Sequence, residues 1–433
     1  MLRLTLLGGL ALLLLAPLGA APLRPITPPP LEGEWPQWRG PNRDGLSLEK
    51  GLLKEWPKAG PPLLWEAKGA GRGYASVVIA RGKVFTMGDA PSIATDKDEY
   101  LLCFDATNGK PLWKAKLGPP WNQGTPTWQG SRATPTVDGD RVYALTGQGN
   151  LVCLETATGK ELWRKNFEKD LGGKKGDNFG YSESVLIDGD RLICTPGGEK
   201  TTMAALNKRT GATIWTTAQP KNAGAGHASI VIAEVAKTRV CVQTTVSGVL
   251  GVRASDGKLL WSYPVEKARA VVATPVVRGA LVFFSAGQGH GGALLRQVAD
   301  GDGVKIEVVY PMKKELVNQQ GGALLIGDHL YGDTDQSAPF CADLMTGKVF
   351  WKGSRPGKNS AALTSADGHL YIRYQDGTMV LAEASPTAYK EVSSFKIPHS
   401  NTARPSWAHP VIAGGRLYLR EGDSILCYDL RAK

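Results

Sequence analysis

The sequence lacks the cysteine patterns of a metal or redox site. It has six cysteines in 433 residues, with no Cys-x-x-Cys pair and no Cys/His cluster at zinc-binding spacing. Four of them hold the same place in different copies of a repeat described below, which puts them too far apart for a disulfide: Cys103, Cys153, Cys341 and Cys427. Cys194 and Cys241 hold non-equivalent places in neighbouring copies. We expect the four equivalent cysteines to be small buried hydrophobic residues, and a disulfide between Cys194 and Cys241 is the less favoured alternative to two free thiols.

Long helical segments and basic runs are also missing. After the N-terminus no segment sustains a helical period, while 53 Gly and 28 Pro residues punctuate the chain, as is typical of an all-β protein. The net charge is +11, but Lys and Arg are scattered over turns and form no run with interleaved aromatic residues. The charge therefore indicates a basic surface, either simply solvated or attracted to acidic cell-envelope polymers, and does not indicate nucleic-acid binding.

The first 21 residues have the pattern of an export signal. Arg3 is followed by an apolar run over residues 4–16 and by small residues at 19–21 that suit cleavage. The apolar run is short for a membrane span, and no Cys follows the small residues. We therefore expect a soluble periplasmic or secreted protein, with an uncleaved anchor as the alternative. Residues 22–60 are expected to form a Pro-rich linker and N-terminal extension.

The sequence does contain one phrase that recurs along its length. Residues 153–163 read Cys-Leu-Glu-Thr-Ala-Thr-Gly-Lys-Glu-Leu-Trp, and similar phrases end at Trp113 and Trp351. Weaker copies end at Trp215 and Trp261, and in every copy the Trp lies four residues after the Gly. A period of about 45 to 50 residues indicates a repeat architecture.

Each period predicts four short strands joined by hairpins, which make one propeller blade. Eight apolar opening strands mark eight blades: 76–85, 133–143, 184–193, 229–242, 274–283, 323–331, 363–371 and 409–418. The fifth and seventh blades replace the Trp phrase with segments ending near Tyr310 and Phe395. The eighth lacks its outer strand, which residues 63–66 at the other end of the chain are predicted to supply. We therefore predict an all-β, eight-bladed propeller over residues 61–433, whose closed ring leaves no exposed edge strand.

The phrase resembles the tryptophan-docking repeat of the pyrroloquinoline quinone (PQQ) repeat superfamily, over about residues 62–430. That superfamily contains quinoprotein alcohol dehydrogenases and the outer-membrane protein assembly lipoprotein of the β-barrel assembly machinery. Residues 35–45, which read Trp-Pro-Gln-Trp-Arg-Gly-Pro-Asn-Arg-Asp-Gly, also look like the start of exported members. The resemblance implies that six Trp rings wedge against neighbouring blades: Trp65, Trp113, Trp163, Trp215, Trp261 and Trp351. It implies a fold and not a reaction.

The dehydrogenases of this superfamily require particular groups. PQQ carries three carboxylates that need Arg or Lys partners, its Ca²⁺ needs carboxylate and amide oxygens, and an Asp acts as the base. The sequence has no adjacent Cys pair, which such enzymes often have, and its carboxylates do not align with the calcium and base positions. No metal site and no catalytic residue is predicted, and PQQ with calcium remains an alternative.

Polar residues gather in the loops that lead into the innermost strands. Such loops converge on one mouth of a propeller channel, which is the usual binding surface. The candidate cofactor-binding or partner-binding residues at this mouth are Arg132, Tyr181, Glu183, His227, Gln320, Asn359 and Trp407. The alternative is that these residues solvate a water-filled channel and satisfy the strand ends.

Two functions are consistent with these patterns. The first is an exported, monomeric propeller that is not an enzyme and binds a protein, peptide or cell-envelope polymer at its channel mouth. The second is a PQQ-dependent dehydrogenase that oxidises an alcohol or sugar. A calcium-competent carboxylate pair beside a stacking aromatic at the mouth would distinguish the second from the first.

Overall fold

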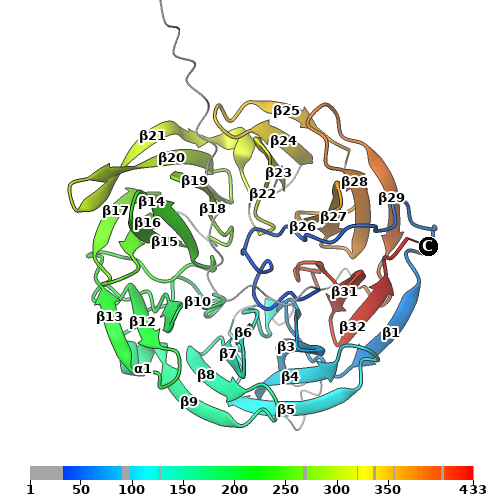
Figure 1. The fold of residues 1–433 in the computed structure, drawn as a ribbon, viewed down its shortest axis with the longest axis horizontal. Coiled ribbons are helices and arrows are strands. Elements are labelled where there is room, and N and C mark those ends of the chain that lie inside the picture. The colour runs from blue at the N-terminus through cyan, green and yellow to red at the C-terminus, as the bar shows by residue number, and fades with distance from the viewer. Residues whose placement is uncertain are drawn as a thin grey trace, which may run out of the picture.

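The computed structural model describes residues 33–89, 98–123, 125, 128–266, 271–318, 320–334, 338–354, 356–400 and 404–432. Its strands form eight four-stranded antiparallel sheets arranged in a ring (Figure 1). The predicted eight-bladed β-propeller is therefore confirmed. The predicted export signal and the Pro-rich part of the linker lie outside the described residues.

Each blade runs from a short innermost strand beside the channel to an outermost strand at the rim, and we number the blades from 1 to 8 along the chain. Blade 1 comprises β2 (Val78–Ala80), β3 (Lys83–Asp89), β4 (Glu99–Asp105) and β5 (Pro111–Gly118), and blade 2 comprises β6 (Thr136–Asp138), β7 (Arg141–Leu145), β8 (Asn150–Glu155) and β9 (Glu161–Asn166). Blade 3 comprises β10 (Leu186–Asp188), β11 (Arg191–Cys194), β12 (Met203–Asn207) and β13 (Thr213–Thr217), and blade 4 comprises β14 (Val231–Val235), β15 (Thr238–Thr245), β16 (Gly248–Arg253) and β17 (Leu259–Pro264).

Blades 5 to 8 follow the same order, except that the last blade takes its outermost strand from the start of the chain. Blade 5 comprises β18 (Val276–Arg278), β19 (Leu281–Ala286), β20 (Gly291–Asp300) and β21 (Gly303–Lys313), and blade 6 comprises β22 (Leu324–Ile326), β23 (His329–Asp333), β24 (Pro339–Asp343) and β25 (Val349–Lys352). Blade 7 comprises β26 (Ala361–Ala366), β27 (His369–Tyr374), β28 (Thr378–Glu383) and β29 (Glu391–Lys396), and blade 8 comprises β30 (Val411–Ala413), β31 (Arg416–Glu421), β32 (Ser424–Asp429) and β1 (Leu63–Lys68).

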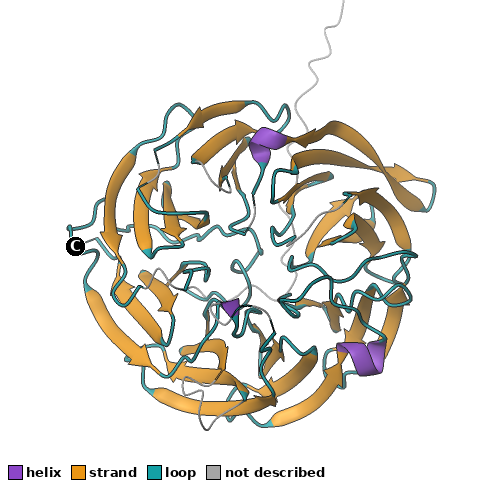
Figure 2. Cartoon of the chain, turned by 180° about the vertical axis from the view of Figure 1, so that it is seen from behind, coloured by secondary structure: helices purple, strands orange, loops and turns teal. Residues whose placement is uncertain are grey.

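In the part of the chain that the structure describes, helix is confined to short pieces between blades (Figure 2). The helix α1 (Phe167–Leu171) follows β9, and the 3-10 turn η2 (Lys314–Leu316) follows β21. Among the described helices, none combines the length and the apolar character needed to cross a membrane.

The ring closes where the two ends of the propeller meet. Strand β1 pairs antiparallel with β32, with Trp65 opposite Cys427 and Lys68 opposite Ser424. This is the predicted closure, and it pairs the two strand edges that would otherwise lie open.

The recurring Trp side chains bridge adjacent blades. The indole N–H of Trp163 donates to the carbonyl of Lys208 in the next blade, at 3.0 Å. Four other rings make the same kind of bond to a backbone carbonyl, and Trp261 donates to the side chain of Gln297: Trp65 to Ala106, Trp113 to Thr156, Trp215 to Ala254, Trp351 to Ser385. One polar bond and one large apolar surface therefore join each of these pairs of blades.

In four of the five phrases the Gly makes room for the Trp of the preceding blade, and Gly347 of the fifth lies against Tyr310. Gly257 has a φ of +76°, and a Cβ there would lie 2.6 Å from the ring of Trp215. Gly109, Gly159 and Gly211 stand in the same relation to Trp65, Trp113 and Trp163. The phrase therefore needs Gly for two reasons, the left-handed backbone and the close approach of the ring. In the last interface Gly60 lies against Phe395, which replaces the Trp of blade 7.

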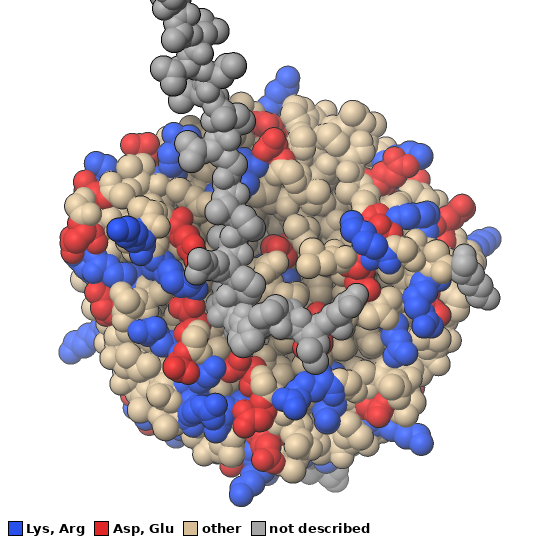
Figure 3. All heavy atoms as spheres, viewed as in Figure 1, with Lys and Arg blue, Asp and Glu red and all other residues tan. Residues whose placement is uncertain are grey.

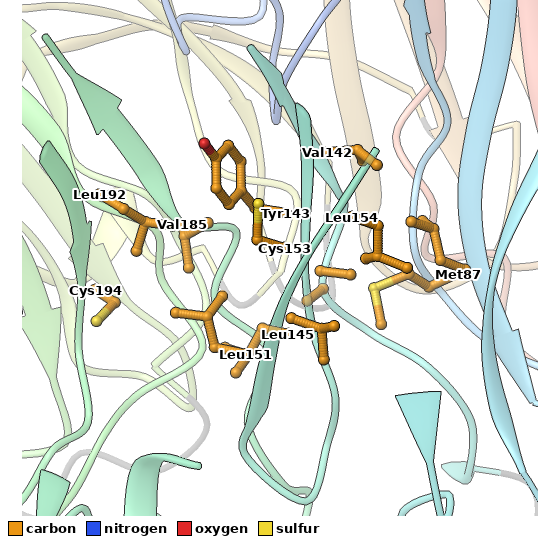
Figure 4. Close-up of a cluster of buried hydrophobic side chains, with 14 of the residues drawn as sticks. Met87, Val142, Tyr143, Leu145, Leu151, Cys153, Leu154, Val185, Leu192 and Cys194 are labelled. Carbon is orange, nitrogen blue, oxygen red and sulfur yellow. The ribbon is translucent and has the colours of Figure 1, made fainter. Parts of the chain in front are cut away.

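The hydrophobic core lies between the blades (Figure 4). Met87 of blade 1, Leu154 of blade 2 and Leu192 of blade 3 belong to one cluster of buried side chains. All six cysteines are buried and free, as expected. Cys153 lies directly opposite Trp163 in the strand pair β8–β9, and burial raises the pKa of the equivalent Cys103 to about 12. These thiols are packing residues and poor nucleophiles.

Charged side chains are spread over the surface. On the face shown in Figure 3, Lys and Arg are interspersed with Asp and Glu instead of gathering in one patch. This distribution agrees with the scattered basic residues of the sequence and gives that face no broad positive stripe of the kind that tracks a nucleic-acid backbone.

Candidate functional site

The N-terminal extension enters the channel of the propeller (Figure 1). We call residues 35–47 the plug. Trp35 and Ile79 of blade 1 exchange two backbone hydrogen bonds, of 2.8 and 2.9 Å, and the carbonyl of Pro36 accepts from Val137 of blade 2. At the other end Ser47 donates to the carbonyl of Ser365 in blade 7. The plug is therefore bonded to the innermost strands at both ends.

Two arginines anchor the middle of the plug. The guanidinium of Arg43 donates to the carbonyls of Ser184 and Val185 in blade 3, at 2.5 and 3.1 Å. Arg39 donates at 2.6 Å to the carbonyl of Ala323 in blade 6. Burial lowers the pKa of both guanidinium groups to about 10, so both stay charged at neutral pH. Because a buried charge is costly without hydrogen bonds, each guanidinium group depends on the carbonyl groups that surround it.

A partial ring of hydroxyls lies at the same level in blades 1 to 5. The backbone N–H of Thr134 donates to the Ser184 hydroxyl, and that of Ser184 to the Ser229 hydroxyl, each at 3.0 Å. Ser76 and Thr274 hold the equivalent places in blades 1 and 5. The ring stops at blade 6, where Gly322 leaves the space that Arg39 fills: a Cβ there would lie 2.8 Å from Nη1.

Trp38 of the plug forms part of a cavity of about 250 Å³ at the channel mouth. Its indole N–H donates to Thr274 at 3.0 Å, and its ring lies 4.5 Å from that of His409, whose pKa burial lowers to about 3. We call this cavity the mouth pocket. Its lining contains five aromatic rings, one aliphatic side chain and a set of polar groups. The rings are those of Trp38, Tyr74, Trp128, Phe179 and Trp407, the aliphatic side chain is Val272, and the polar groups are Arg132, Ser182, Ser184, His227, Ser229, Gln288, Gln320 and His409.

Arg132 ties the loops of the mouth together. Its guanidinium carbon lies 5.0 Å from the centre of the Tyr74 ring, 5.4 Å from Phe179 and 5.6 Å from Trp407. Nε also donates to the carbonyl of Phe179 at 3.2 Å, and Nη2 donates to the carbonyl of Trp128. Burial lowers the pKa of Arg132. The cation therefore fixes aromatic side chains from the loops that enter blades 1, 3 and 8.

A serine, a histidine and an aspartate are hydrogen-bonded in sequence at the edge of this pocket. The Oγ atom of Ser182 lies 2.7 Å from Nδ1 of His227, and Nε2 of His227 lies 2.7 Å from Oδ2 of Asp177. Burial alone would raise the pKa of Asp177, but the hydrogen bond and charge of His227 lower it below its usual value. An ionised Asp177 favours the tautomer with the proton on Nε2.

The structure brings together only some of the predicted mouth residues. Arg132, His227, Gln320 and Trp407 line the mouth pocket, whereas Tyr181, Glu183 and Asn359 do not. Successive residues of an extended chain point to opposite sides, so Ser182 and Ser184 face the channel while their neighbours turn into the core. Asn359 lies in a turn before β26, with a φ of +61°.

Tyr181 and Glu183 have core partners. The Tyr181 hydroxyl donates to the carbonyl of Pro196 at 3.0 Å, and its ring packs edge-on against Phe167. The Glu183 carboxyl accepts from the N–H of Thr195 at 2.7 Å and from its hydroxyl at 2.9 Å. Sequence reasoning missed Ser182 and four of the five aromatic rings of the pocket, those of Trp38, Tyr74, Trp128 and Phe179. For Ser182 the alternation of residues 181–184 was the available signal.

The buried carboxyls predict a pH dependence of stability. Burial raises the pKa of Glu183 and Glu99 to about 8, so the folded protein holds protons that the unfolded chain releases. This stabilisation is complete below about pH 4.5 and is lost as the pH rises through 8, at roughly 1.4 kcal/mol for each pKa unit. The melting temperature is expected to fall between pH 5 and pH 9, and Glu183→Gln should flatten that fall. Parallel curves for parent and variant would contradict this assignment.

The mouth pocket does not offer the donor set that a quinone cofactor needs. Its described lining has one Arg, no Lys and no Asp or Glu. No group of three or more His, Cys, Asp or Glu residues that could hold a metal ion is found in the described part of the chain. Three carboxylates and a calcium ion would therefore lack most of their partners among these residues.

The eight-bladed fold, the repeated phrase and the contacts of its Trp side chains with the next blade define the class of the protein. It is a β-propeller of the PQQ-repeat superfamily. The chain belongs to the family described as outer membrane protein assembly factor BamB, whose family model matches residues 97–353. It is 25% identical over 261 residues to outer membrane protein assembly factor BamB of Shewanella oneidensis, a match that covers 56% of this chain and 61% of that protein. The chain thus spans about three fifths of that relative.

Solved structures share the fold at low sequence identity. BamB from Moraxella catarrhalis has a TM-score of 0.58 and 15% identity, over 83% of this chain and 95% of that one. Quinohemoprotein alcohol dehydrogenase from Comamonas testosteroni has a TM-score of 0.64 and 13% identity, over 93% of this chain and 81% of that one. At this identity the likeness extends to the fold and does not choose between the two functions.

Proposed function

We propose that this protein is an exported binding module that holds a segment of a protein, peptide or cell-envelope polymer in its mouth pocket. The observation that carries the proposal is the pocket itself, where five aromatic rings from separate segments line one cavity with His, Gln and Ser side chains. Aromatic faces provide large apolar contact areas, and the few polar groups fix orientation. The family's description as an assembly factor supports a protein partner.

Hydrogen bonds and ring contacts hold the walls of the pocket in place. Trp38 is fixed by its bond to Thr274, and Arg132 is held by stacked rings and by the carbonyl of Phe179. Loops that are fixed in this way on a propeller lose little conformational entropy when a ligand binds. The plug is therefore part of the binding site as well as a support for the channel.

The competing function is a PQQ-dependent dehydrogenase, which the fold permits. The lining residues favour the binding module because they lack carboxylates for calcium. The decisive comparison is the melting temperature of the purified protein with and without PQQ and CaCl₂. A rise in melting temperature together with dye-linked oxidation of an alcohol or sugar would replace the binding module by the dehydrogenase.

Trp128→Ala is expected to weaken capture of the partner at least ~10-fold, because it removes an aromatic anchor that the bound partner would cover. The Trp128 ring lines the pocket and is 43% exposed, so its removal should leave the melting curve almost unchanged. Phe350 on β25 is equally exposed, at 43%, but does not line the pocket, so Phe350→Ala is the matched control. The measurement is the amount of envelope protein or polymer retained by each immobilised variant. Equal retention by all three proteins would reject the pocket as the binding site.

A further inference from the structure

The hydrogen-bonded series Ser182, His227 and Asp177 has the parts of a nucleophilic site. The Ser182 hydroxyl is within 2.7 Å of a ring nitrogen that can take its proton, and the other ring nitrogen is oriented by a carboxylate at 2.7 Å. Nucleophile, base and orienting group within these distances are the arrangement that activates a serine. Which of the two imidazole nitrogens faces the serine does not alter this chemistry.

The fold, and not a local motif, assembles this series. Asp177 and Ser182 lie in the loop that enters blade 3, and His227 lies in the loop that enters blade 4. Ser182 and His227 both line the mouth pocket, and the ring of Phe179 lies 6.1 Å from that of His227. The side chain of His227 is 7% exposed, so it is shielded from most solvent while its partner serine borders the cavity.

We propose that Ser182 is the nucleophile of an ester-hydrolysing site in the mouth pocket, with His227 as its general base and Asp177 as the residue that positions His227. The substrate class is a carboxylic ester with an aromatic acyl group, because the cavity of about 250 Å³ is walled by aromatic rings. Arg132 is the one Arg or Lys among the described lining residues, and it adds positive charge to the pocket in which an oxyanion would form.

The reaction balances without a cofactor. Ser182 Oγ bonds to the ester carbonyl carbon as its proton passes to Nδ1 of His227. The bond from that carbon to the alcohol oxygen then breaks, and the alcohol leaves with the proton from His227. Water next attacks the acyl carbon and gives a proton to His227, which returns it to Ser182 Oγ as the carboxylic acid departs.

This inference goes beyond the proposed binding function and does not depend on it. A pocket can hold a polymer without cleaving it, and a small ester can be cleaved without the natural partner. Retention of the partner by the immobilised protein measures the binding function, whereas probe labelling at Ser182 measures the esterase. The two proposals therefore fail separately.

The test uses a fluorophosphonate probe and p-nitrophenyl benzoate on the purified full chain. The parent protein is expected to gain one probe at Ser182, located by peptide mass spectrometry, and to release nitrophenolate. Ser182→Ala should abolish labelling and lower hydrolysis at least ~100-fold, and His227→Gln should lower both to a similar degree. Asp177→Asn should lower kcat about 10-fold or more with little change in KM, which a structural role alone would not produce.

The matched control is Ser385→Ala, which removes a hydroxyl in the turn between β28 and β29 that contacts Thr387 and does not line the mouth pocket. It should label and hydrolyse like the parent, and all variants should keep the parent melting curve. Absence of labelling in the parent, labelling at another serine, or unchanged hydrolysis in Ser182→Ala would each overturn the proposal.

Discussion

Replacing Trp215 by Ala is expected to lower the free energy of unfolding by roughly 3 to 5 kcal/mol. The ring is 7% exposed, it fills the space above Gly257 in the next blade, and its N–H bonds to the carbonyl of Ala254 at 3.2 Å. The substitution leaves a cavity between two blades and an unpaired carbonyl. Urea-induced unfolding, followed by circular dichroism, measures the effect.

Gly257→Val tests the same contact from the other blade. The added side chain meets the Trp215 ring and also has to adopt a φ of +76°, so a loss of comparable size is expected. Ile214 precedes Trp215 on β13 and is 46% exposed, which makes Ile214→Ala the control, with a change within about 0.5 kcal/mol. If all three variants unfold at the parent urea concentration, the phrase has no role in holding the blades together.

Arg43→Leu is expected to lower the free energy of unfolding by roughly 2 to 4 kcal/mol and to release the plug from the channel. The substitution leaves the carbonyls of Ser184 and Val185 without their charged donor in a buried site. Because Trp38 belongs to the same segment, its fluorescence should change, and proteases should cut within residues 33–47 of the folded variant. The mouth pocket should therefore lose its Trp38 wall along with the plug.

Two further variants, one in the plug and one beyond it, serve as references for this prediction. Arg43→Lys keeps the charge but loses the forked pair of donors, so an intermediate loss is expected. Lys50 is exposed just beyond the plug, and Lys50→Ala should unfold like the parent. A plug that stays resistant to proteases in Arg43→Leu would show that Arg43 does not anchor it.

The blades were predictable because each carries its own copy of the same local pattern. The Gly-x-x-x-Trp spacing gave the turn and the outermost strand, and the missing strand of blade 8 identified its partner at Trp65. Even the blades without the phrase kept a large ring, Tyr310 or Phe395, at the place of the Trp, because the interface has to be filled by some large apolar group.

The site was less predictable because its contacts are not local. The sequence of the plug has no period, and Arg39 and Arg43 take their partners from blades 6 and 3, which no spacing rule connects to them. Tyr181 and Glu183 were chosen for their chemistry, whereas the direction of each side chain was set by the alternation of the chain beside Ser182. Loop position alone does not say which of two neighbouring residues faces a channel.

The closure of the ring by β1 and β32 also determines when the molecule can finish folding. About 360 residues separate the two strands in the chain, so the first strand to be synthesised waits for the last one. Until β32 arrives, the free edge of β1 is open to pairing with the wrong strand, and contacts this distant in sequence form slowly. A chain cut short before residue 424 therefore lacks the pairing partner of β1, and the ring of such a chain stays open.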